Sequence, residues 1–440
     1  MSVSTHGIAG DGPLSRRGDA SPLDRSISPH DRDILRSLAG AWAAAAVDPI
    51  NAQRADLWRR LNRLEGVKPP IWINEIPWHE MNVDDELTLR CDDPFCREHE
   101  TIMRRTLYQW RHLPGDMTIE PVYYSPLVIH DTGFGIDEDV DIVRTDDASD
   151  IVSRHFYRQI DSEEDMDKIA MPVITQDVAA SEANYAALNK AIGDIVRVEM
   201  RGAPGFWFAP WDELIRWWGV EQAMTDLVLR PELVHAAMER LTTAYLSRLD
   251  QYEAQGLLSL NNTNVRIGSG GYGYSDELPQ PDFDAEQVRP IDLWGCGTAQ
   301  IFGAVSPAMH EEFALQYERR WMSRFGLNYY GCCEPLHLKV EMLRSVPRLR
   351  KLSMSPWIDL DVAVQNVGDE FVFSHKPNPA VFAEDVWNPA KARQMLEEVL
   401  ARTRECRVEV IMKDISTVRY EPQRLWAWSE MAQEVTAEYA

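Results

Sequence analysis

Two adjacent cysteines, Cys332 and Cys333, are followed directly by Glu334 and, three positions later, by His337. Thiolate, carboxylate and imidazole groups are the ligands that zinc takes in proteins. The spacing is not that of a zinc finger, and adjacent side chains at a strand end point to opposite faces. We expect at least one thiol to bind metal, and the main alternative is that both pack in the core, where free cysteines are common.

Other polar residues follow short β-prone runs elsewhere in the chain. Histidine titrates near neutral pH, so it can serve as a metal ligand or as a general acid. One of these histidines, His375, could equally satisfy a turn, and Lys413 with Asp414 could equally be a structural ion pair. The candidates at the ends of these runs are Glu75, His79, Asn262, Asn264, His375, Lys376, Lys413 and Asp414.

Eight β-prone runs must position these residues, and each is followed by a helical pattern or by a helical pattern with an insertion. The runs begin near residues 71, 117, 196, 257, 327, 349, 371 and 408. This alternation favours an α/β fold of the (β/α)8 TIM barrel type over an open sheet. In such a barrel the residues after each strand converge on one mouth. The candidate residues would therefore become neighbours.

The chain divides by composition into three segments. Residues 1–28 lack apolar periodicity and predict a flexible leader, residues 29–66 predict an N-terminal helical extension, and residues 67–440 predict the barrel with its insertions. The glycines between 268 and 273 match neither a dinucleotide nor a Walker fingerprint and predict a turn-rich loop over the pocket. Fifteen tryptophans, Trp207 among them, suggest an aromatic-lined cavity.

The composition excludes several classes of protein. The formal net charge of −25 argues against a nucleic-acid binder and against an anionic membrane surface. Apolar stretches are too short to span a bilayer, and the N-terminus lacks the apolar core of a secretory signal. We expect a cytoplasmic protein acting on a small molecule, with a homodimer as a further possibility. Six cysteines are too few for a disulfide scaffold of this length.

Six sequence segments are characteristic: IWINEIPWHEMN (71–82), LSLNNTN followed by GSGGYGYSDELP (258–279), FGLNYYGCCEPLH (325–337), LRKLSMSPW (349–357), FSHKPNPA (373–380) and VEVIMKD (408–414). Together they resemble the uroporphyrinogen decarboxylase superfamily, and specifically its methyltransferase-like branch of corrinoid-dependent demethylases. True uroporphyrinogen decarboxylases carry an arginine-rich motif near the first strand, and this chain has no arginine there, which argues against a porphyrinogen substrate.

The related methyltransferases place His-x-Cys after the fifth strand and a further Cys near the last strand as zinc ligands. Here the first motif reads Tyr330-Gly331-Cys332, so only the cysteine carries over, and Met412-Lys413-Asp414 has no cysteine. Any zinc must therefore recruit its other ligands locally. The ligand set that we predict is Cys332, Cys333, Glu334 and His375.

The resemblance implies a zinc-assisted methyltransferase that moves a methyl group from a small methoxylated or related donor to a corrinoid. No Asp-x-His-x-x-Gly segment occurs, so the corrinoid would arrive on a partner protein. The alternative is a cofactor-independent decarboxylase or lyase of an aromatic or heterocyclic acid, whose carboxylate Lys413, Lys376 and Arg266 would hold. The predicted catalytic residues are Glu75, His79, Lys413 and Asp414, and the predicted substrate-binding residues are Asn262, Asn264, Tyr330, Lys376 and Trp207.

Overall fold

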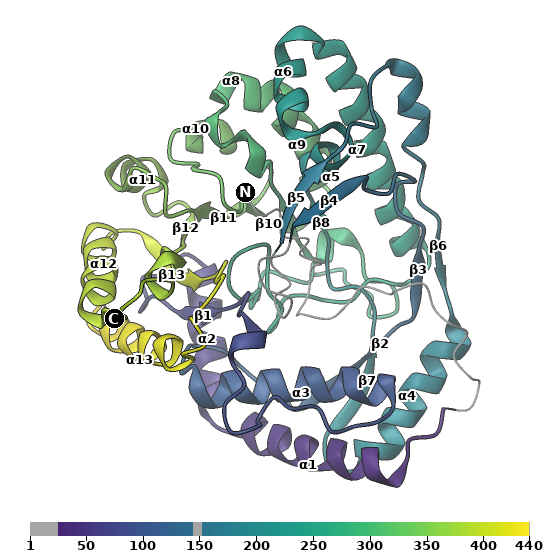
Figure 1. The fold of residues 1–440 in the computed structure, drawn as a ribbon, viewed down its shortest axis with the longest axis vertical. Helices are drawn as coiled ribbons and strands as arrows, with labels where there is room; N and C mark the ends of the chain where they lie inside the picture. Colours follow the sequence, from purple (N-terminus) through teal and green to yellow (C-terminus); the bar gives the residue numbers. More distant parts are fainter. Residues whose placement is uncertain (1–24, 144–151, 440) are drawn as a thin grey trace.

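The computed structural model describes residues 25–143 and 152–439, so most of the predicted leader lies outside the described residues. Its centre is a parallel seven-stranded sheet in the order β1-β13-β12-β11-β10-β9-β8 (Figure 1). The first and last of these strands along the chain pair directly, with Ile71 opposite Val410. The strands are β1 (Ile71–Ile73), β8 (Trp207–Phe208), β9 (Trp294–Gly297), β10 (Leu327–Tyr330), β11 (Leu349–Met354), β12 (Val372–His375) and β13 (Arg407–Met412).

Two further strands, β2 (Val122–Pro126) and β7 (Arg197–Arg201), form a separate parallel pair, and a single bridge joins Ala203 to Leu258. Among the described strands the pairing does not close into a continuous barrel. The fold is α/β, and its parallel strands with surrounding helices have a TIM-barrel-like arrangement. This confirms the predicted fold class in part, because a closed barrel is not formed by the described strands. The run predicted near residue 257 contributes only that bridge, and neither β8 nor β9 was predicted.

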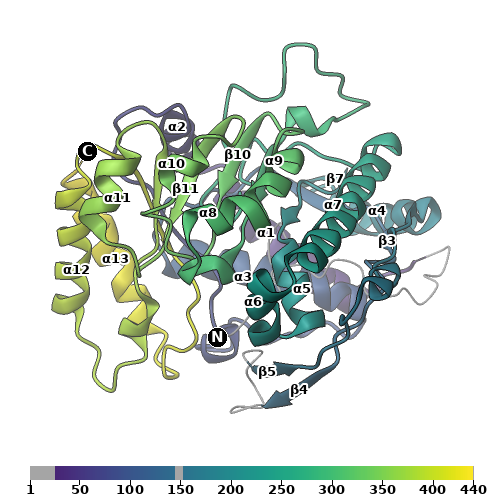
Figure 2. The same ribbon diagram turned by 90° about the horizontal axis from the view of Figure 1, so that it is seen from above.

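Helices surround the sheet, and those of the second half of the chain lie on its outer side (Figures 1 and 2). None of the described helices has both the length and the apolar character that a membrane span needs. The helices are α1 (Pro29–Ala46), α2 (Ile50–Asn62), α3 (Pro94–His112), α4 (Val178–Ile192), α5 (Pro210–Trp218), α6 (Val220–Leu229), α7 (Pro231–Ala254), α8 (Pro307–His310), α9 (Gln316–Met322), α10 (Val340–Leu343), α11 (Leu360–Val367), α12 (Pro389–Arg402) and α13 (Gln423–Ala437).

Two antiparallel pairs complete the structure: β3 (Ile129–Asp131) with β6 (Ile174–Gln176), and β4 (Val140–Val143) with β5 (Ser153–Phe156). The N-terminal residues 29–62 form α1 and α2, and α1 begins where the Ser28 hydroxyl accepts a hydrogen bond from Asp31 N. Helix α1 packs against α3 and α4 through Leu35 and Ala39. The division of the chain into a helical extension and a barrel domain stays a prediction.

Side chains alternate across the strands, which gives the sheet an outer and an inner face. Phe373 and Val410 belong to the large apolar cluster that the surrounding helices complete, and this is the outer face. Val372 and Ile411 lie one position away and pack with Trp58 of α2 in a separate cluster, on the inner face. The register of each strand therefore decides which polar residues can enter the interior.

The glycine-rich loop fills that interior instead of covering a pocket, which corrects the expectation from the sequence. A Cβ atom on Gly268 or Gly270 would clash with the side chain of Tyr329. A Cβ atom on Gly271 would clash with the side chain of Trp58. Gly271 N also donates to the buried Glu409 carboxylate, at 3.2 Å. Glycine is required here because the loop backbone approaches these inner-face side chains closely.

Candidate active site

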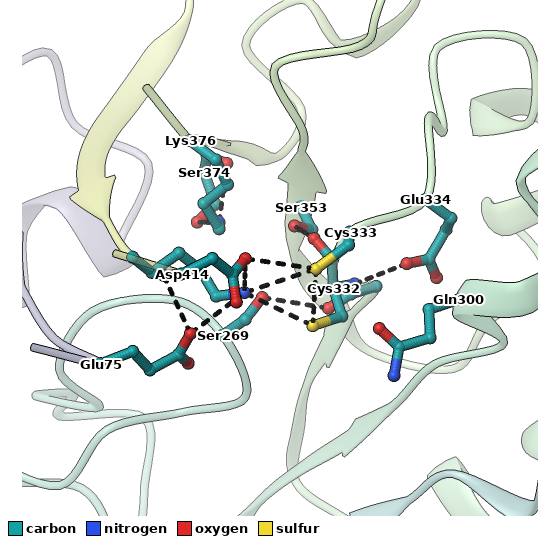
Figure 3. Close-up of polar contacts among 12 residues, drawn as sticks. Glu75, Ser269, Gln300, Cys332, Cys333, Glu334, Ser353, Ser374, Lys376 and Asp414 are labelled. Atoms are coloured by element: carbon teal, nitrogen blue, oxygen red, sulfur yellow. Dashed lines mark hydrogen bonds and ion pairs between the residues drawn. The ribbon is translucent and has the colours of Figure 1, made fainter. Parts of the chain in front are cut away.

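The two predicted thiols lie side by side directly after β10 (Figure 3). Gly331 turns the chain with a φ of 97°. The N–H and the carbonyl of Cys332, the next residue, are both hydrogen-bonded to side chains. Its N–H donates to Glu334 Oε2 at 2.8 Å, and its carbonyl accepts from Ser353 Oγ at 2.7 Å. The Sγ atoms of Cys332 and Cys333 are 3.6 Å apart, are not joined as a disulfide and belong to partly exposed residues.

Lys413, the first residue after β13, brings an ammonium group to both sulfurs. Its Nζ lies 3.7 Å from Cys332 Sγ and 3.5 Å from Cys333 Sγ. The same atom is 2.6 Å from Asp414 Oδ2 and 3.5 Å from Glu75 Oε2. Cys333 also donates to Asp414 Oδ2, at 3.4 Å. We call Cys332, Cys333, Lys413, Asp414 and Glu75 the dithiol cluster.

The two residues that supply the carboxylates of the dithiol cluster have strained backbone conformations. Glu75 and Asp414 have φ values of 53° and 56°, in the left-handed region that residues other than glycine seldom adopt. Their positions are fixed to each other, because Asp414 N donates to Glu75 Oε2 at 3.1 Å. Arg266 NH2 pairs with the other oxygen of Glu75 at 2.6 Å. Backbone strain of this kind is concentrated at functional sites.

Charges inside the cluster shift its pKa values in opposite directions. The hydrogen bond from Cys333 and the charge of Lys413 lower the pKa of Cys332, although burial opposes them. The hydrogen bond to Cys332 and burial raise the pKa of Cys333. Burial alone would lower the pKa of Lys413, but the nearby negative groups raise it well above its ordinary value. The cluster therefore favours one thiolate, one thiol and a charged ammonium.

Beneath the cluster, buried polar side chains form a column on the inner face of the sheet. Lys376 Nζ donates to the Tyr329 hydroxyl at 3.0 Å and to the Ser374 carbonyl at 2.8 Å. Burial lowers the pKa of Lys376 to about 7. Deeper in the column, Lys351 and Glu409 form a fully buried ion pair at 2.8 Å. The structure thus brings the predicted residue Lys376 close to the dithiol cluster.

Two of the predicted zinc ligands point elsewhere. Glu334 uses one oxygen on Cys332 N and accepts from Thr298 Oγ1 with the other, at 2.9 Å, so its carboxylate lies away from the sulfurs (Figure 3). His375 alternates with Ser374 and Lys376 along β12 and therefore faces the outer side. Burial lowers the pKa of His375 to about 3, so the ring is neutral.

The described residues contain one group of three or more metal-type side chains whose ligand atoms all lie within 4.8 Å of one another. It consists of His30, Asp31 and Asp92 near the start of α1 and includes none of the predicted ligands. Asp31 already accepts from Asp92 N and Asp93 N, at 2.8 and 3.2 Å. The four predicted ligands are therefore not assembled as one set, and zinc binding stays a prediction.

Other predicted site residues have partners away from the sulfurs. His79 lies on a short 3-10 turn, with Nε2 3.6 Å from Glu80 Oε1. Asn262 Nδ2 donates to the Leu278 carbonyl at 2.7 Å and so holds its own loop. Asn264 lies in the bend that follows, and Trp207 packs against the cluster containing Ile267 and Cys296. The interactions found for these residues position loops and do not involve the thiols.

Tyr330, predicted to bind substrate, faces the outer side and joins a sealed polar network. Its hydroxyl lies 2.6 Å from His310 Nε2 and donates to Glu318 Oε2 at 2.7 Å. Lys339 Nζ contacts His310 Nδ1 at 3.0 Å. Burial raises the pKa of Glu318 to about 8 and lowers that of His310 to about 3. We call Tyr330, His310, Glu318 and Lys339 the outer network.

The sequence also failed to indicate three residues beside Glu334, because neither β8 nor β9 was predicted as a strand. Thr298 and Gln300 follow β9, and Asp212 follows β8. Gln300 Nε2 donates to Asp212 Oδ2 at 2.6 Å, and Figure 3 shows the Gln300 side chain next to Glu334. Burial raises the pKa of Asp212 to about 7. The segment WGCG lacks the β-branched residues that would have marked it as a strand.

No protein-family model matches this sequence, and no curated protein matches it. Among solved structures, a methyltransferase from Methanosarcina mazei is similar with a TM-score of 0.49 and 10% sequence identity. The alignment covers 87% of this chain and 98% of that chain. A similarity of this size identifies neither a family nor an activity.

Proposed function

We propose that the chain is a methyltransferase that transfers a methyl group from a small methoxylated donor to a corrinoid carried by a partner protein. The observation that carries the proposal is the pair of thiols 3.6 Å apart beside a buried ammonium. The pair lies at the carboxyl ends of parallel strands, where enzymes of TIM-barrel-like architecture place their active sites. The sequence segments quoted above add the resemblance to corrinoid-dependent demethylases.

The dithiol cluster contains donor types that zinc accepts, although its three donor atoms do not all lie within 4.8 Å of one another. Two sulfurs lie 3.6 Å apart, and the Asp414 oxygen is 3.4 Å from one of them. Two thiolates and a carboxylate are ligands that zinc accepts, and three protein ligands leave a position for substrate. Cys332, Cys333 and Asp414 would hold the ion in place of the ligand set expected from the sequence. Bound zinc would supply Lewis acidity toward the donor oxygen.

The chain's own residues supply positive charge and orientation. Breaking a methyl–oxygen bond leaves negative charge on the oxygen, and fixed cations in a water-poor site stabilise such charge. Lys413 stays protonated because its pKa is raised, so it stabilises charge and does not release its proton. Glu75 fixes Lys413 and Arg266 relative to each other. Lys376, with a pKa of about 7, can exchange a proton near neutral pH.

The test is a methyl-transfer assay with reduced free cobalamin as acceptor and a panel of methoxylated compounds, followed by the change in cobalamin absorbance. Cys332→Ala and Cys333→Ala should each lower the rate at least about a hundredfold, since even residues that only support metal ligands cost 10- to 100-fold. Cys406→Ala, which changes a buried cysteine outside the cluster, is the matched control. A Cys332→Ala enzyme as fast as the control would refute the proposal.

A second function is favoured by the three cations at this site, Lys376, Lys413 and Arg266. Together they could hold the carboxylate of an aromatic or heterocyclic acid in a decarboxylase or lyase that needs no cofactor. The two functions separate in protein treated with a chelator. Release of carbon dioxide from aromatic acids by the metal-free protein would favour this second function, and loss of all turnover on chelation would reject it.

A further inference from the structure

The arrangement of the two thiols permits chemistry that methyl transfer does not use. We propose that Cys332 and Cys333 are a redox modification site, at which a hydroperoxide closes a disulfide between the adjacent cysteines and a dithiol reductant reopens it. The proposal concerns the site described above, but it does not require that site to transfer methyl groups. Its basis is the distance of 3.6 Å between two unjoined sulfurs on partly exposed residues.

Closing the bond needs only local movement. A disulfide bond is about 2.0 Å long, so the sulfurs must approach each other by about 1.6 Å. Both sulfurs belong to neighbouring residues, so no second segment of the chain has to move. The backbone of Cys332 stays anchored by Glu334 and Ser353 while the side chains rotate. Adjacent Cα atoms are about 3.8 Å apart, closer than in ordinary disulfides, so reductants should reopen the bond readily.

The neighbouring charges favour reaction at sulfur. Lys413 Nζ lies within 3.7 Å of both sulfurs, and an ammonium in that position stabilises negative sulfur, the form that attacks peroxides. Asp414 Oδ2 accepts from Cys333 and can take up a thiol proton. After oxidation Lys413 keeps its contacts with Asp414 and Glu75, so its charge remains compensated.

The reaction balances with one hydroperoxide per pair of thiols. One sulfur attacks a peroxide oxygen, the O–O bond breaks, and a sulfenic acid and one water (or one alcohol) form. The second sulfur then attacks the sulfenic sulfur, forming the S–S bond and releasing one water. The two thiols lose two electrons and two protons, and the peroxide is reduced. Dithiothreitol reverses the change by thiol–disulfide exchange.

The experiment exposes the full-length protein as purified to stoichiometric hydrogen peroxide, quenches it by alkylation and digests it with trypsin. One tryptic peptide, residues 325–339, contains both cysteines. We expect this peptide to lose two hydrogens, two of the six thiols to disappear, and dithiothreitol to restore both. Retention of both thiols, or loss that dithiothreitol does not reverse, would overturn the proposal.

Variants test the pairing itself. Cys332→Ser and Cys333→Ser cannot close the bond, so the remaining cysteine should gain oxygen instead, and Cys406→Ser should behave like the wild type. Peptide masses do not depend on activity, and a circular dichroism spectrum checks that each variant is folded. Wild-type protein that gains oxygen on this peptide as fast as the single variants would show that the second thiol does not resolve the first.

The same samples keep this inference separate from the proposed function. A reversible disulfide in protein that transfers no methyl group supports the modification site and rejects the function. Methyl transfer by protein that forms no disulfide supports the proposed function and rejects the modification site. If the protein both transfers methyl groups and forms the disulfide, closing the disulfide should abolish methyl transfer, because both sulfurs are unavailable as ligands in the oxidised protein. Reduction should restore methyl transfer.

Discussion

Tyr329 and Tyr330 are neighbours on β10, yet they serve different polar regions. Tyr329 faces inward, where its hydroxyl meets Ser269 at 2.9 Å and Lys376 at 3.0 Å, in the column beneath the dithiol cluster. Tyr330 faces outward, where its hydroxyl links His310 to Glu318. A shift of one residue in register would exchange the two regions.

The difference between the regions lies in backbone strain and solvent access. The inner region ends in partly exposed thiols and contains left-handed backbone at Glu75 and Asp414. The outer network is fully buried, and none of its members has a positive φ. Strain and exposed reactive groups reduce stability and are expected where chemistry occurs. We therefore assign chemistry to the inner region and stability to the outer one.

The largest effect should follow from Lys413→Met, which removes the ammonium from the dithiol cluster. Lys413 is only 3% exposed, and removing one partner of a buried ion pair costs about 3 kcal/mol. Methyl transfer should fall about a hundredfold, because the charge beside the sulfurs is lost. Lys391→Met, at an exposed ion pair with Glu384, is the control in activity assays and urea denaturation. Activity within twofold of the control would break the assignment.

An intermediate effect, on stability alone, should follow from Tyr330→Phe. The variant leaves His310 and Glu318 without a shared buried partner, which costs about 1–3 kcal/mol of unfolding free energy in urea. Its methyl-transfer rate should stay near that of the wild type at a temperature where both are folded. Tyr329→Phe is the matched inner-face variant and should change the rate more. A large rate loss in Tyr330→Phe without destabilisation would reverse the comparison.

The effect that is smallest per pH unit concerns the pH dependence of stability. The folded protein holds the proton of Glu318 up to its raised pKa of about 8, whereas the unfolded chain releases it near 4.5. Between these values the folded state binds more protons, so the unfolding free energy falls as pH rises. Relative to Glu318→Gln, the wild type should lose on the order of 1 kcal/mol per pH unit in this window. Parallel stability curves for the two proteins would contradict the buried, protonated carboxyl.

The sequence predicted the strands whose patterns are locally plain, β1 and β10 to β13, and with them the residues at their ends. It missed β8, which has only two residues, and β9, because two glycines and no β-branched residue occur in WGCG. It could not anticipate that the glycine-rich loop enters the interior, since that depends on the approach of Trp58 and Glu409 from distant segments.

Within the site, proximity in sequence was a poor guide to which side chains meet. Glu334 follows the thiols directly but binds backbone and Thr298, whereas Lys413, 80 positions from Cys333, reaches both sulfurs. His375 and Lys376 are adjacent, but the alternation of β12 sends them to opposite faces. The register that decides such pairs is set by packing across the whole sheet and is not readable from one segment.

The most direct test of the central claim is elemental analysis of the purified, untagged protein beside Cys332→Ala, Cys333→Ala and Cys406→Ala. The proposal predicts about one zinc per chain in the wild type and in Cys406→Ala, and loss of zinc in both variants of the dithiol cluster. Zinc that persists unchanged in Cys332→Ala and Cys333→Ala, or a wild-type protein that transfers methyl groups without zinc, would contradict it.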